Sequence, residues 1–388
     1  MSRASTQVVV IGGGVVGCAV AHALARRRVQ VTLLEAEAAL GLGASGANSG
    51  ILHTGFDSTP GELETRLILR SGVLRDELLG ELRVPVWRCG ARLTPVEEQE
   101  RVTVAALAAN ARANGVVVEL EADGSLSVPG ESVTDPLAFL RALAAAARAG
   151  GAQVRCGASV AGLARAPAGG VRVELADGER LEARAAVNCA GLFADEVAAL
   201  AGEHPVQIYP RKGEFLVFAA PPEEPLERIL LPVPSALGKG VLVFPTIDRR
   251  IVAGPTARER EDKLDWSVEP DAGELIMSRA ARMYPPLRSA TQVGAYAGLR
   301  PAGRGANYVI EHSRTLPGLV HVAAIRSTGL SASLGIAEHV LEMLAGQGLV
   351  EPGPPRALPV SEVGRTDGSW WERAAQRSAS SAQGQARR

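Results

Sequence analysis

The chain has 388 residues, of which 46% are hydrophobic and 21% charged, and its formal net charge is −1. This length suits one large or two modest domains, and the composition is that of an ordinary globular protein rather than a disordered one. The near-neutral charge gives no general attraction to polyanions, so no nucleic-acid partner is expected.

Cysteine spacing and the N-terminal sequence bear on metal binding and on the cellular compartment. The four cysteines show no C-x-x-C spacing, so neither a zinc nor an iron–sulfur centre is expected, and no metal site is predicted. The N-terminus lacks the apolar stretch of a signal peptide, and no uncharged apolar run reaches membrane-spanning length. We therefore expect a cytoplasmic protein, and leave open a peripheral contact with a membrane.

The first 35 residues follow the pattern of a strand, a helix and a second strand. The β-branched run Val8–Ile11 is typical of a buried parallel strand, and a helical pattern extends from Val15 to about Arg28. A second apolar run from Val31 ends at Glu35. This order indicates a complete β-α-β unit.

Three glycines occupy the turn of this unit in the pattern G-x-G-x-x-G. Gly12 permits a tight turn, Gly14 lets the backbone approach a pyrophosphate, and Gly17 lets the helix pack closely on the strand. The free N–H groups at the start of the helix favour a phosphate there. Glu35 at the second strand end is placed to bind ribose hydroxyls, which predicts a dinucleotide other than NADP and leaves NAD and FAD open.

The next segment, residues 43–67, is rich in glycine and small polar residues and contains a single histidine, His53. It has too much glycine for a good helix and is too polar for a buried strand. Glycines let a backbone come close to another surface, and Asn48 and Ser49 offer hydrogen bonds without bulk. The pattern indicates a loop that lies against such a surface.

Together with the β-α-β unit, the sequence GASGANSGILHTG resembles the FAD-dependent oxidoreductases of the D-amino-acid oxidase superfamily. The resemblance is closer to the glycerol-3-phosphate dehydrogenase and L-2-hydroxyglutarate oxidase branch. Later segments resemble blocks of this family in the same order, at 187–202, 209–215, 238–262, 296–301 and 327–344. The resemblance covers about residues 7–345 and implies FAD as the cofactor.

The resemblance implies an α/β fold, with a Rossmann-like FAD-binding domain and a discontinuous, mainly antiparallel-sheet substrate domain of the α+β type. The residues after about 352 are rich in Pro, Gly, Ser, Gln and Arg, which is typical of a mobile tail, with Trp370 and Trp371 as candidates for docking. The expected FAD-binding domain consists of three segments, 1–83, 135–204 and 299–350. The expected substrate domain consists of two segments, 84–134 and 205–298, and a flexible tail is expected at 351–388.

The resemblance also implies which residues contact the cofactor. The loop of residues 43–67 would lie against the flavin ring, Val160 would present backbone atoms to the adenine, and the segment from Thr328 would contact the pyrimidine end of the flavin. Besides the three glycines of the turn and Glu35, the expected contacts are Val15, Val16, Ala36, Ser45, Asn48, Ser49, Gly50, Ile51, Val160, Ala190, Gly191, Arg300, Thr328, Gly329, Leu330 and Ser331.

Two residues are the leading catalytic candidates. Arg300 in the Gly-Leu-Arg-Pro block is expected to clamp an anionic group, because its planar fork matches carboxylate or phosphate oxygens. The alternative is an arginine in a surface ion pair. His53 is expected to act as a base or hydrogen-bond partner for the substrate oxygen, because imidazole titrates near working pH. The alternatives are a histidine that orients the cofactor or one that attaches to it covalently.

Three further cations are candidates for the same pocket. Arg211 and Lys212 lie in the family block YPRKGEF and are expected either to face the pocket or to be solvated. Relatives often read Glu-Ser-Pro-Gly-Leu where this chain has Arg326-Ser327-Thr328-Gly329-Leu330. Arg326 is therefore expected to strengthen anion binding, to change the substrate, or to be compensated by a neighbour.

The implied reaction is oxidation of a CH–OH or CH–NH group by hydride transfer to the flavin N5. The favoured substrate is a small anionic secondary alcohol, sn-glycerol 3-phosphate, which would be oxidised to the ketone, with a quinone, a carrier or O₂ as electron acceptor. The alternatives are an L-2-hydroxyglutarate-type 2-hydroxy acid, an amino acid or N-methyl amine, a non-catalytic FAD-binding electron-transfer subunit, and an NAD-binding regulator.

Overall fold

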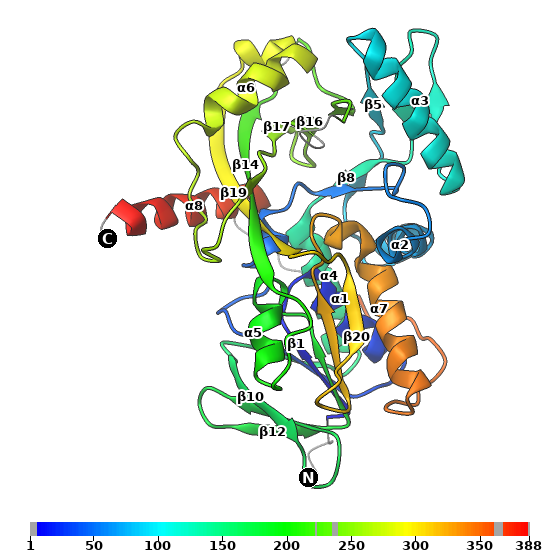
Figure 1. The fold of residues 1–388 in the computed structure, drawn as a ribbon, viewed down its shortest axis with the longest axis vertical. Coiled ribbons are helices and arrows are strands. Elements are labelled where there is room, and N and C mark those ends of the chain that lie inside the picture. Colours follow the sequence, from blue (N-terminus) through cyan, green and yellow to red (C-terminus); the bar gives the residue numbers. More distant parts are fainter. Residues whose placement is uncertain (1–5, 222, 235–239, 361–367, 387–388) are drawn as a thin grey trace.

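The computed structural model describes residues 6–221, 223–234, 240–360 and 368–386, and Figure 1 shows two regions, each built on its own sheet. The lower region in that view contains a parallel sheet flanked by helices, and the upper region contains a mainly antiparallel sheet. The predicted fold class, α/β with a Rossmann-like region and a second, mainly antiparallel region, is confirmed.

The lower sheet has six strands in the order β20-β21-β13-β1-β2-β9. All neighbouring pairs are parallel except β20 with β21. Its central strands are buried along their whole length, as in a parallel sheet covered on both faces. The strands are β1 (Val8–Ile11), β2 (Val31–Glu35), β9 (Gln153–Cys156), β13 (Ala185–Asn188), β20 (Val309–His312) and β21 (Leu319–Ala323).

Strand register decides where the loops of this sheet meet. Ile11 at the end of β1 pairs with Leu34 of β2 on one side and with Asn188 of β13 on the other. The chain therefore leaves all three strands at the same edge of the sheet. In open parallel sheets this carboxyl edge is where ligands bind.

Helices and a small sheet surround the parallel sheet. α1 (Val15–Arg26) packs against α4 (Pro136–Ala149) and α7 (Gly329–Gly346), and α7 packs against α2 (Leu63–Glu81). No helix formed by the described residues is long and apolar enough to cross a membrane. The remaining elements here are β10 (Val160–Arg165), β11 (Val171–Leu175), β12 (Arg180–Ala183), α5 (Ala194–Ala199), η1 (Ala44–Ala47) and η2 (Gly191–Phe193).

The upper sheet has nine strands, in the order β18-β14-β17-β16-β15-β5-β7-β6, with β19 also paired to β14. Strands from the segment 84–134 and from the segment 205–303 join in this one sheet. Its elements are β5 (Ala91–Leu93), α3 (Glu98–Ala113), β6 (Glu119–Leu120), β7 (Leu126–Val128), β14 (Ile208–Ala219), β15 (Ile229–Leu231), β16 (Leu242–Pro245), β17 (Arg250–Gly254), β18 (Arg258–Glu259), α6 (Ala272–Met283), η3 (Pro285–Arg288) and β19 (Gln292–Gly303).

The long antiparallel pair β14–β19 extends from the upper region toward the lower one (Figure 1). In its register Arg211 stands opposite Arg300, and Lys212 stands opposite Leu299. Residues opposite each other in an antiparallel pair project from the same face, and the next pair projects from the other face. Arg211 and Arg300 therefore share one face of the sheet, and Lys212 lies on the other.

A separate three-stranded sheet joins distant segments of the sequence: β3 (Ile51–Leu52), β8 (Ser132–Thr134) and β4 (Val86–Trp87). β3 and β8 are antiparallel, with Ile51 opposite Val133 and Leu52 opposite Ser132. Continuing this register by one residue brings His53 to Glu131. The short sheet thus sets the position of the loop that contains His53.

The C-terminal segment departs from the prediction of a flexible tail. Residues 351–360 contain no helix or strand, but Trp370–Ala386 form the helix α8 (Figure 1, red). Trp370 and Trp371 are both buried, and the Ser378 hydroxyl accepts a hydrogen bond of 3.0 Å from the backbone N–H of Ala297 in β19. The helix supplies an acceptor and an apolar face to an edge strand, which composition alone could not reveal.

Replacing Trp371 with Ala should lower the free energy of unfolding by about 3–5 kcal/mol, the usual cost of removing a buried aromatic side chain. The change also removes the hydrogen bond of 2.8 Å from the indole Nε1 to Asp248. Chemical denaturation measures the loss. Gln376→Ala, on the exposed face of the same helix, is the control and should change stability by less than about 0.5 kcal/mol. Equal stability of the two variants would contradict the docking of α8.

Candidate active site

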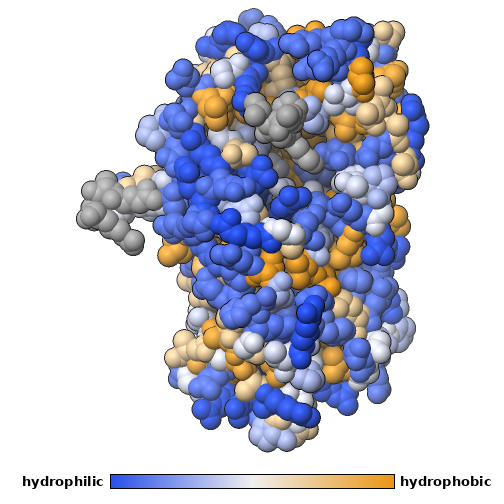
Figure 2. Space-filling view, in the orientation of Figure 1, coloured by the Kyte–Doolittle hydropathy of each residue, from blue (hydrophilic) through white to orange (hydrophobic). Residues whose placement is uncertain are grey.

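A cavity of about 1100 Å³ lies where the carboxyl edge of the parallel sheet meets β14 and β19. Ligand pockets commonly measure about 300–1,000 Å³, so this one suits a large ligand or two ligands side by side. Figure 2 shows apolar residues gathered near the middle of one face, between the two regions, with hydrophilic residues around them. The geometry of the cavity wall indicates which ligands fit.

The glycine turn at one end of the cavity has no room for side chains. Gly12 has a φ of +110°, and a Cβ atom there would lie 2.4 Å from the carbonyl oxygen of Cys189. A Cβ on Gly17 would lie 1.9 Å from the Gly12 carbonyl oxygen, so the first turn of α1 rests directly on the turn. Both positions require glycine. Gly14, the N-cap of α1, lines the cavity without a capping side chain.

The start of α1 and the end of β2 are joined by polar contacts. Val15 donates its backbone N–H to the Ser45 hydroxyl over 2.9 Å. The Glu35 carboxylate accepts the N–H of Gly13 over 2.6 Å and that of Glu37 over 2.9 Å. The first turn of a helix favours a negative group, and the acid stands beside it at the edge of the cavity. This arrangement fits the phosphates and ribose of a dinucleotide.

Most of the residues expected at the cofactor line this cavity. The lining residues among them are Gly12, Gly14, Val15, Val16, Glu35, Ala36, Ser45, Asn48, Ser49, Val160, Ala190, Gly191, Arg300, Thr328, Gly329 and Leu330. Four others lie behind the wall: Gly17 in the helix turn, Gly50 and Ile51 beside β8, and Ser331 in α7. Ser331 supports the wall instead, because its hydroxyl accepts the backbone N–H of His53 over 2.8 Å.

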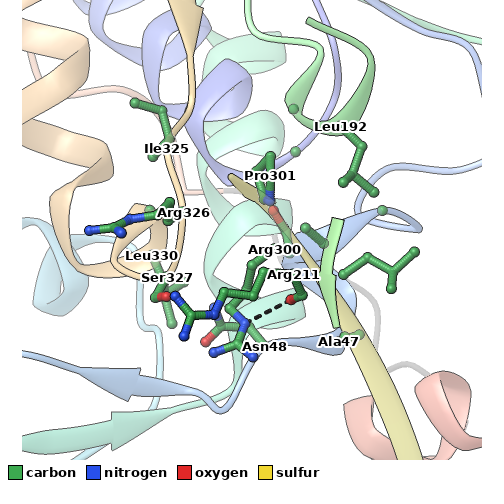
Figure 3. Close-up of a pocket in the computed structure, with 18 of the residues that line it drawn as sticks. Ala47, Asn48, Leu192, Arg211, Arg300, Pro301, Ile325, Arg326, Ser327 and Leu330 are labelled. Carbon is green, nitrogen blue, oxygen red and sulfur yellow. Dashed lines mark hydrogen bonds between the residues drawn. The ribbon is translucent and has the colours of Figure 1, made fainter. Parts of the chain in front are cut away.

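Two arginines from β14 and β19 form the cationic section of the cavity wall. Figure 3 shows the guanidinium groups of Arg211 and Arg300 beside each other, with Asn48 close by. Arg300 donates from Nε to the carbonyl oxygen of Arg211 over 2.9 Å, and from Nη2 to those of Lys212 and Thr256 over 3.1 and 2.9 Å. The alternative of an arginine in a surface ion pair does not describe Arg300.

Among the described residues, no carboxylate lies within ion-pair distance of Arg211 or Arg300. Burial and the charges of Arg211 and Arg326 lower the pKa of Arg300 to about 10. Because like charges opposite each other in a sheet are destabilising, the pair is poised to bind an anion.

Arg326 lies on the neighbouring wall, and Figure 3 shows its side chain extending away from the other two arginines. Its Nη2 atom is 3.9 Å from the Glu64 carboxylate, which also accepts the Thr328 hydroxyl over 2.6 Å. This acid partly offsets the charge of Arg326. Of the alternatives stated for Arg326, this contact supports compensation by a neighbouring residue.

Lys212 neither faces the cavity nor is solvated, which corrects both alternatives expected for it. Its side chain is fully buried on the opposite face of β14, where Nζ is 2.9 Å from Asp265 and 3.3 Å from Glu269. The Ser267 hydroxyl is a third partner at 3.2 Å. The alternation of side chains along a strand separates Lys212 from its neighbour Arg211.

His53 lines the cavity and is held by an acid that sequence reasoning missed. Its Nδ1 atom is 2.9 Å from Oε2 of Glu131, a residue with no exposed surface. The other oxygen of Glu131 accepts the N–H and the hydroxyl of Thr54 over 2.7 and 2.9 Å. A carboxylate on Nδ1 selects the tautomer with the lone pair on Nε2. Only the pairing of β3 with β8 brings the two residues together, so no local motif identifies Glu131.

No group of three or more His, Cys, Asp or Glu side chains in the described ranges is arranged to hold a metal ion. The charged and titratable groups described above for the cavity wall are a histidine–carboxylate pair and a cluster of arginines, beside the glycine turn. Such a set can bind an anion and move a proton beside a cofactor.

Comparison with known proteins finds relatives that match most of the chain. The chain is 29% identical, over 353 residues, to a glycerol 3-phosphate dehydrogenase of Caloramator mitchellensis, an alignment that covers 87% of this chain and 73% of that protein. It is 28% identical to an L-2-hydroxyglutarate dehydrogenase of Escherichia coli over 297 residues, which cover 71% of this chain and 70% of that protein.

Among solved structures, the chain resembles dithionite-reduced L-α-glycerophosphate oxidase from Mycoplasma pneumoniae with FAD bound. The TM-score is 0.84 at 25% identity, covering 92% of this chain and 98% of that one. The family model described as FAD dependent oxidoreductase matches residues 7–343. The expectation of an enzyme that uses FAD is confirmed, and the cavity wall fits that cofactor. The chain belongs to the D-amino-acid oxidase family of FAD-dependent oxidoreductases.

Proposed function

We propose that this enzyme oxidises a small anionic secondary alcohol to the ketone, and that the substrate is sn-glycerol 3-phosphate. The observation that carries the proposal is the pair Arg211 and Arg300, side by side on one wall without a carboxylate partner among the described residues. A phosphate dianion would relieve the repulsion between the two guanidinium groups. It would accept hydrogen bonds from Arg211 and from Nη1 of Arg300, because Nε and Nη2 of Arg300 already donate to backbone carbonyls.

The histidine–carboxylate pair supplies the second requirement of the reaction, a place for the hydroxyl proton. Glu131 holds the His53 ring through Nδ1, and Ser331 holds the His53 backbone. In the tautomer that the carboxylate selects, Nε2 can accept a proton from the substrate hydroxyl. FAD, when bound, supplies the electron acceptor for the oxidised carbon.

The relatives support this substrate class. A glycerol 3-phosphate dehydrogenase and a glycerol 3-phosphate oxidase each match 87% of this chain. A second candidate is an L-2-hydroxyglutarate-type 2-hydroxy acid, because L-2-hydroxyglutarate dehydrogenases match at a similar identity, over 71% of the chain. Arginine forks bind carboxylates as well as phosphates, so the choice between the two needs a measurement.

The test is an anaerobic titration of the purified yellow protein with each compound while the visible flavin absorbance is recorded. We expect sn-glycerol 3-phosphate to bleach the flavin band, and unphosphorylated glycerol to fail because it lacks the anion. Bleaching by L-2-hydroxyglutarate instead would establish the second candidate. Bleaching only by amino acids or N-methyl amines would reject both.

Replacing Arg211 with Met tests the anion clamp. Arg211 is the better target, because replacing Arg300 would also remove three hydrogen bonds to backbone carbonyls. Loss of hydrogen bonds to a charged substrate costs about 1.5–3 kcal/mol, so kcat/KM should fall by ~10–150-fold, mostly through KM. FAD content should not change. Arg314→Met, at a largely exposed arginine, is the control. Equal KM values in both variants would contradict the role of Arg211 in binding the anion.

Replacing Glu131 with Gln tests the histidine–carboxylate pair. Stopped-flow reduction of the flavin at saturating substrate should slow by about 10–100-fold, because the charge that orients the imidazole is lost. His53→Gln should slow the same step at least as much. The double variant should be no slower than His53→Gln alone, because the two residues act as a unit. Additive losses, or normal reduction in Glu131→Gln, would contradict the assignment.

A further inference from the structure

Helix α8 lies beyond residues 7–343, the region matched by the family model, yet it reaches the cofactor cavity. It packs against β19 and against η1, the turn that carries Ser45. One of its side chains, Arg377, belongs to the cavity wall together with Glu35, Glu37 and Trp266. Arg377 therefore reaches the cavity wall from a helix outside the family-matched residues.

Arg377 is held in place by the upper region. Its guanidinium carbon lies 3.9 Å from the centroid of the Trp266 ring, in cation–π geometry. The Trp266 backbone N–H donates over 3.1 Å to the hydroxyl of Ser381, one turn further along α8. The Ser378 hydroxyl accepts from β19 next to Arg377 in sequence. The ring contact thus fixes the guanidinium group, and the two serine hydrogen bonds fix the helix that carries it.

Donors on this arginine and on its stacking partner lack acceptors. Nη1 of Arg377 and Nε1 of Trp266 are both buried and have no hydrogen-bond partner among the described residues. The nearest carboxylate is Glu37, 3.7 Å from Nη2, which is too long for a strong hydrogen bond. Burial lowers the pKa of Arg377 although Glu37 and Glu35 act in the opposite direction. Nε of Arg373 on the same helix also lacks a partner, but Arg373 does not line the cavity, whereas Arg377 and Trp266 do. Because buried donors normally have an acceptor, a ligand in the cavity can supply the one that these two residues lack.

The sequence around the glycine turn supplies no cation for a phosphate. Residues 29–65, which include β2 and η1, contain no lysine or arginine. The backbone N–H groups of α1 and the Ser45 hydroxyl are neutral groups. Arg377 lies on the Glu35–Glu37 side of the cavity, close to where these groups would receive the diphosphate and ribose of FAD.

We propose that Arg377 binds the diphosphate–ribose moiety of FAD, so that α8 completes the cofactor site from outside the family-matched region. Trp266 keeps the guanidinium group flat against the wall and adds its own indole N–H as a donor. The proposal concerns retention of FAD and holds whichever alcohol is the substrate.

The test is the affinity of the full-length apoprotein for FAD, measured by flavin fluorescence in Arg377→Gln, Arg377→Lys and the parent protein. Loss of a charge-assisted contact should weaken FAD binding by about 10–100-fold in Arg377→Gln, with a partial recovery in Arg377→Lys. The affinity of Arg377→Gln should also fall less steeply with added salt, since one charge contact is gone. ADP, used as a competitor of FAD, should lose affinity in parallel.

Arg373→Gln is the matched control, because Arg373 lies one turn earlier on α8 and does not line the cavity. It should bind FAD like the parent protein. An equal loss of FAD affinity in Arg373→Gln would mean that docking of the helix matters rather than a contact from Arg377, and would overturn the proposal. Parent-like FAD affinity in Arg377→Gln, or unchanged competition by ADP, would also overturn it.

Discussion

The register of β14 with β19 is the constraint on which the candidate active site depends. It places Arg211 directly opposite Arg300 on one face and sends Lys212 to the other, where Asp265 and Glu269 neutralise it. A shift by one residue would exchange these faces. The cavity wall then carries two like charges that the sheet alone does not stabilise, and an anion bound between them would relieve their repulsion. The same pair of strands extends between the two regions, so the two arginines lie where the carboxyl edge of the parallel sheet meets the upper sheet.

A second register, that of β3 with β8, brings a buried carboxylate against the histidine of the cavity wall. Two residue pairs of a short sheet are enough to bring Glu131 against His53, although 78 positions separate them in the chain. The buried carboxylate is satisfied by Thr54 on one oxygen and by the imidazole on the other. A buried charge of this kind is costly unless its partners are in place, so the pair orients the histidine as a unit.

The cofactor side of the cavity shows how several segments share one task. Gly12 and Gly17 allow the turn and α1 to touch, Ser45 closes the first turn of that helix, and Glu35 ties the turn to β2. None of these groups is a cation, and the cation nearest to Glu37 comes instead from α8. The C-terminal helix therefore has two roles in this structure: it covers the edge of β19 and it brings Arg377 to the cavity wall.

The sequence by itself determined the β-α-β unit, because that unit rests on local patterns: β-branched runs, three glycines at fixed spacing and an acid at a strand end. The family and the cofactor followed from the resemblance of several segments, in order, to blocks of one family. It also singled out Arg300 and His53, whose segments match family blocks. Only the tertiary structure decided that Arg211 faces the cavity and Lys212 does not, that Glu131 is the partner of His53, and that the supposed tail is a docked helix. Each of these depends on strand register or on packing between distant segments, and neither composition nor spacing along the chain encodes which side chains meet across a sheet.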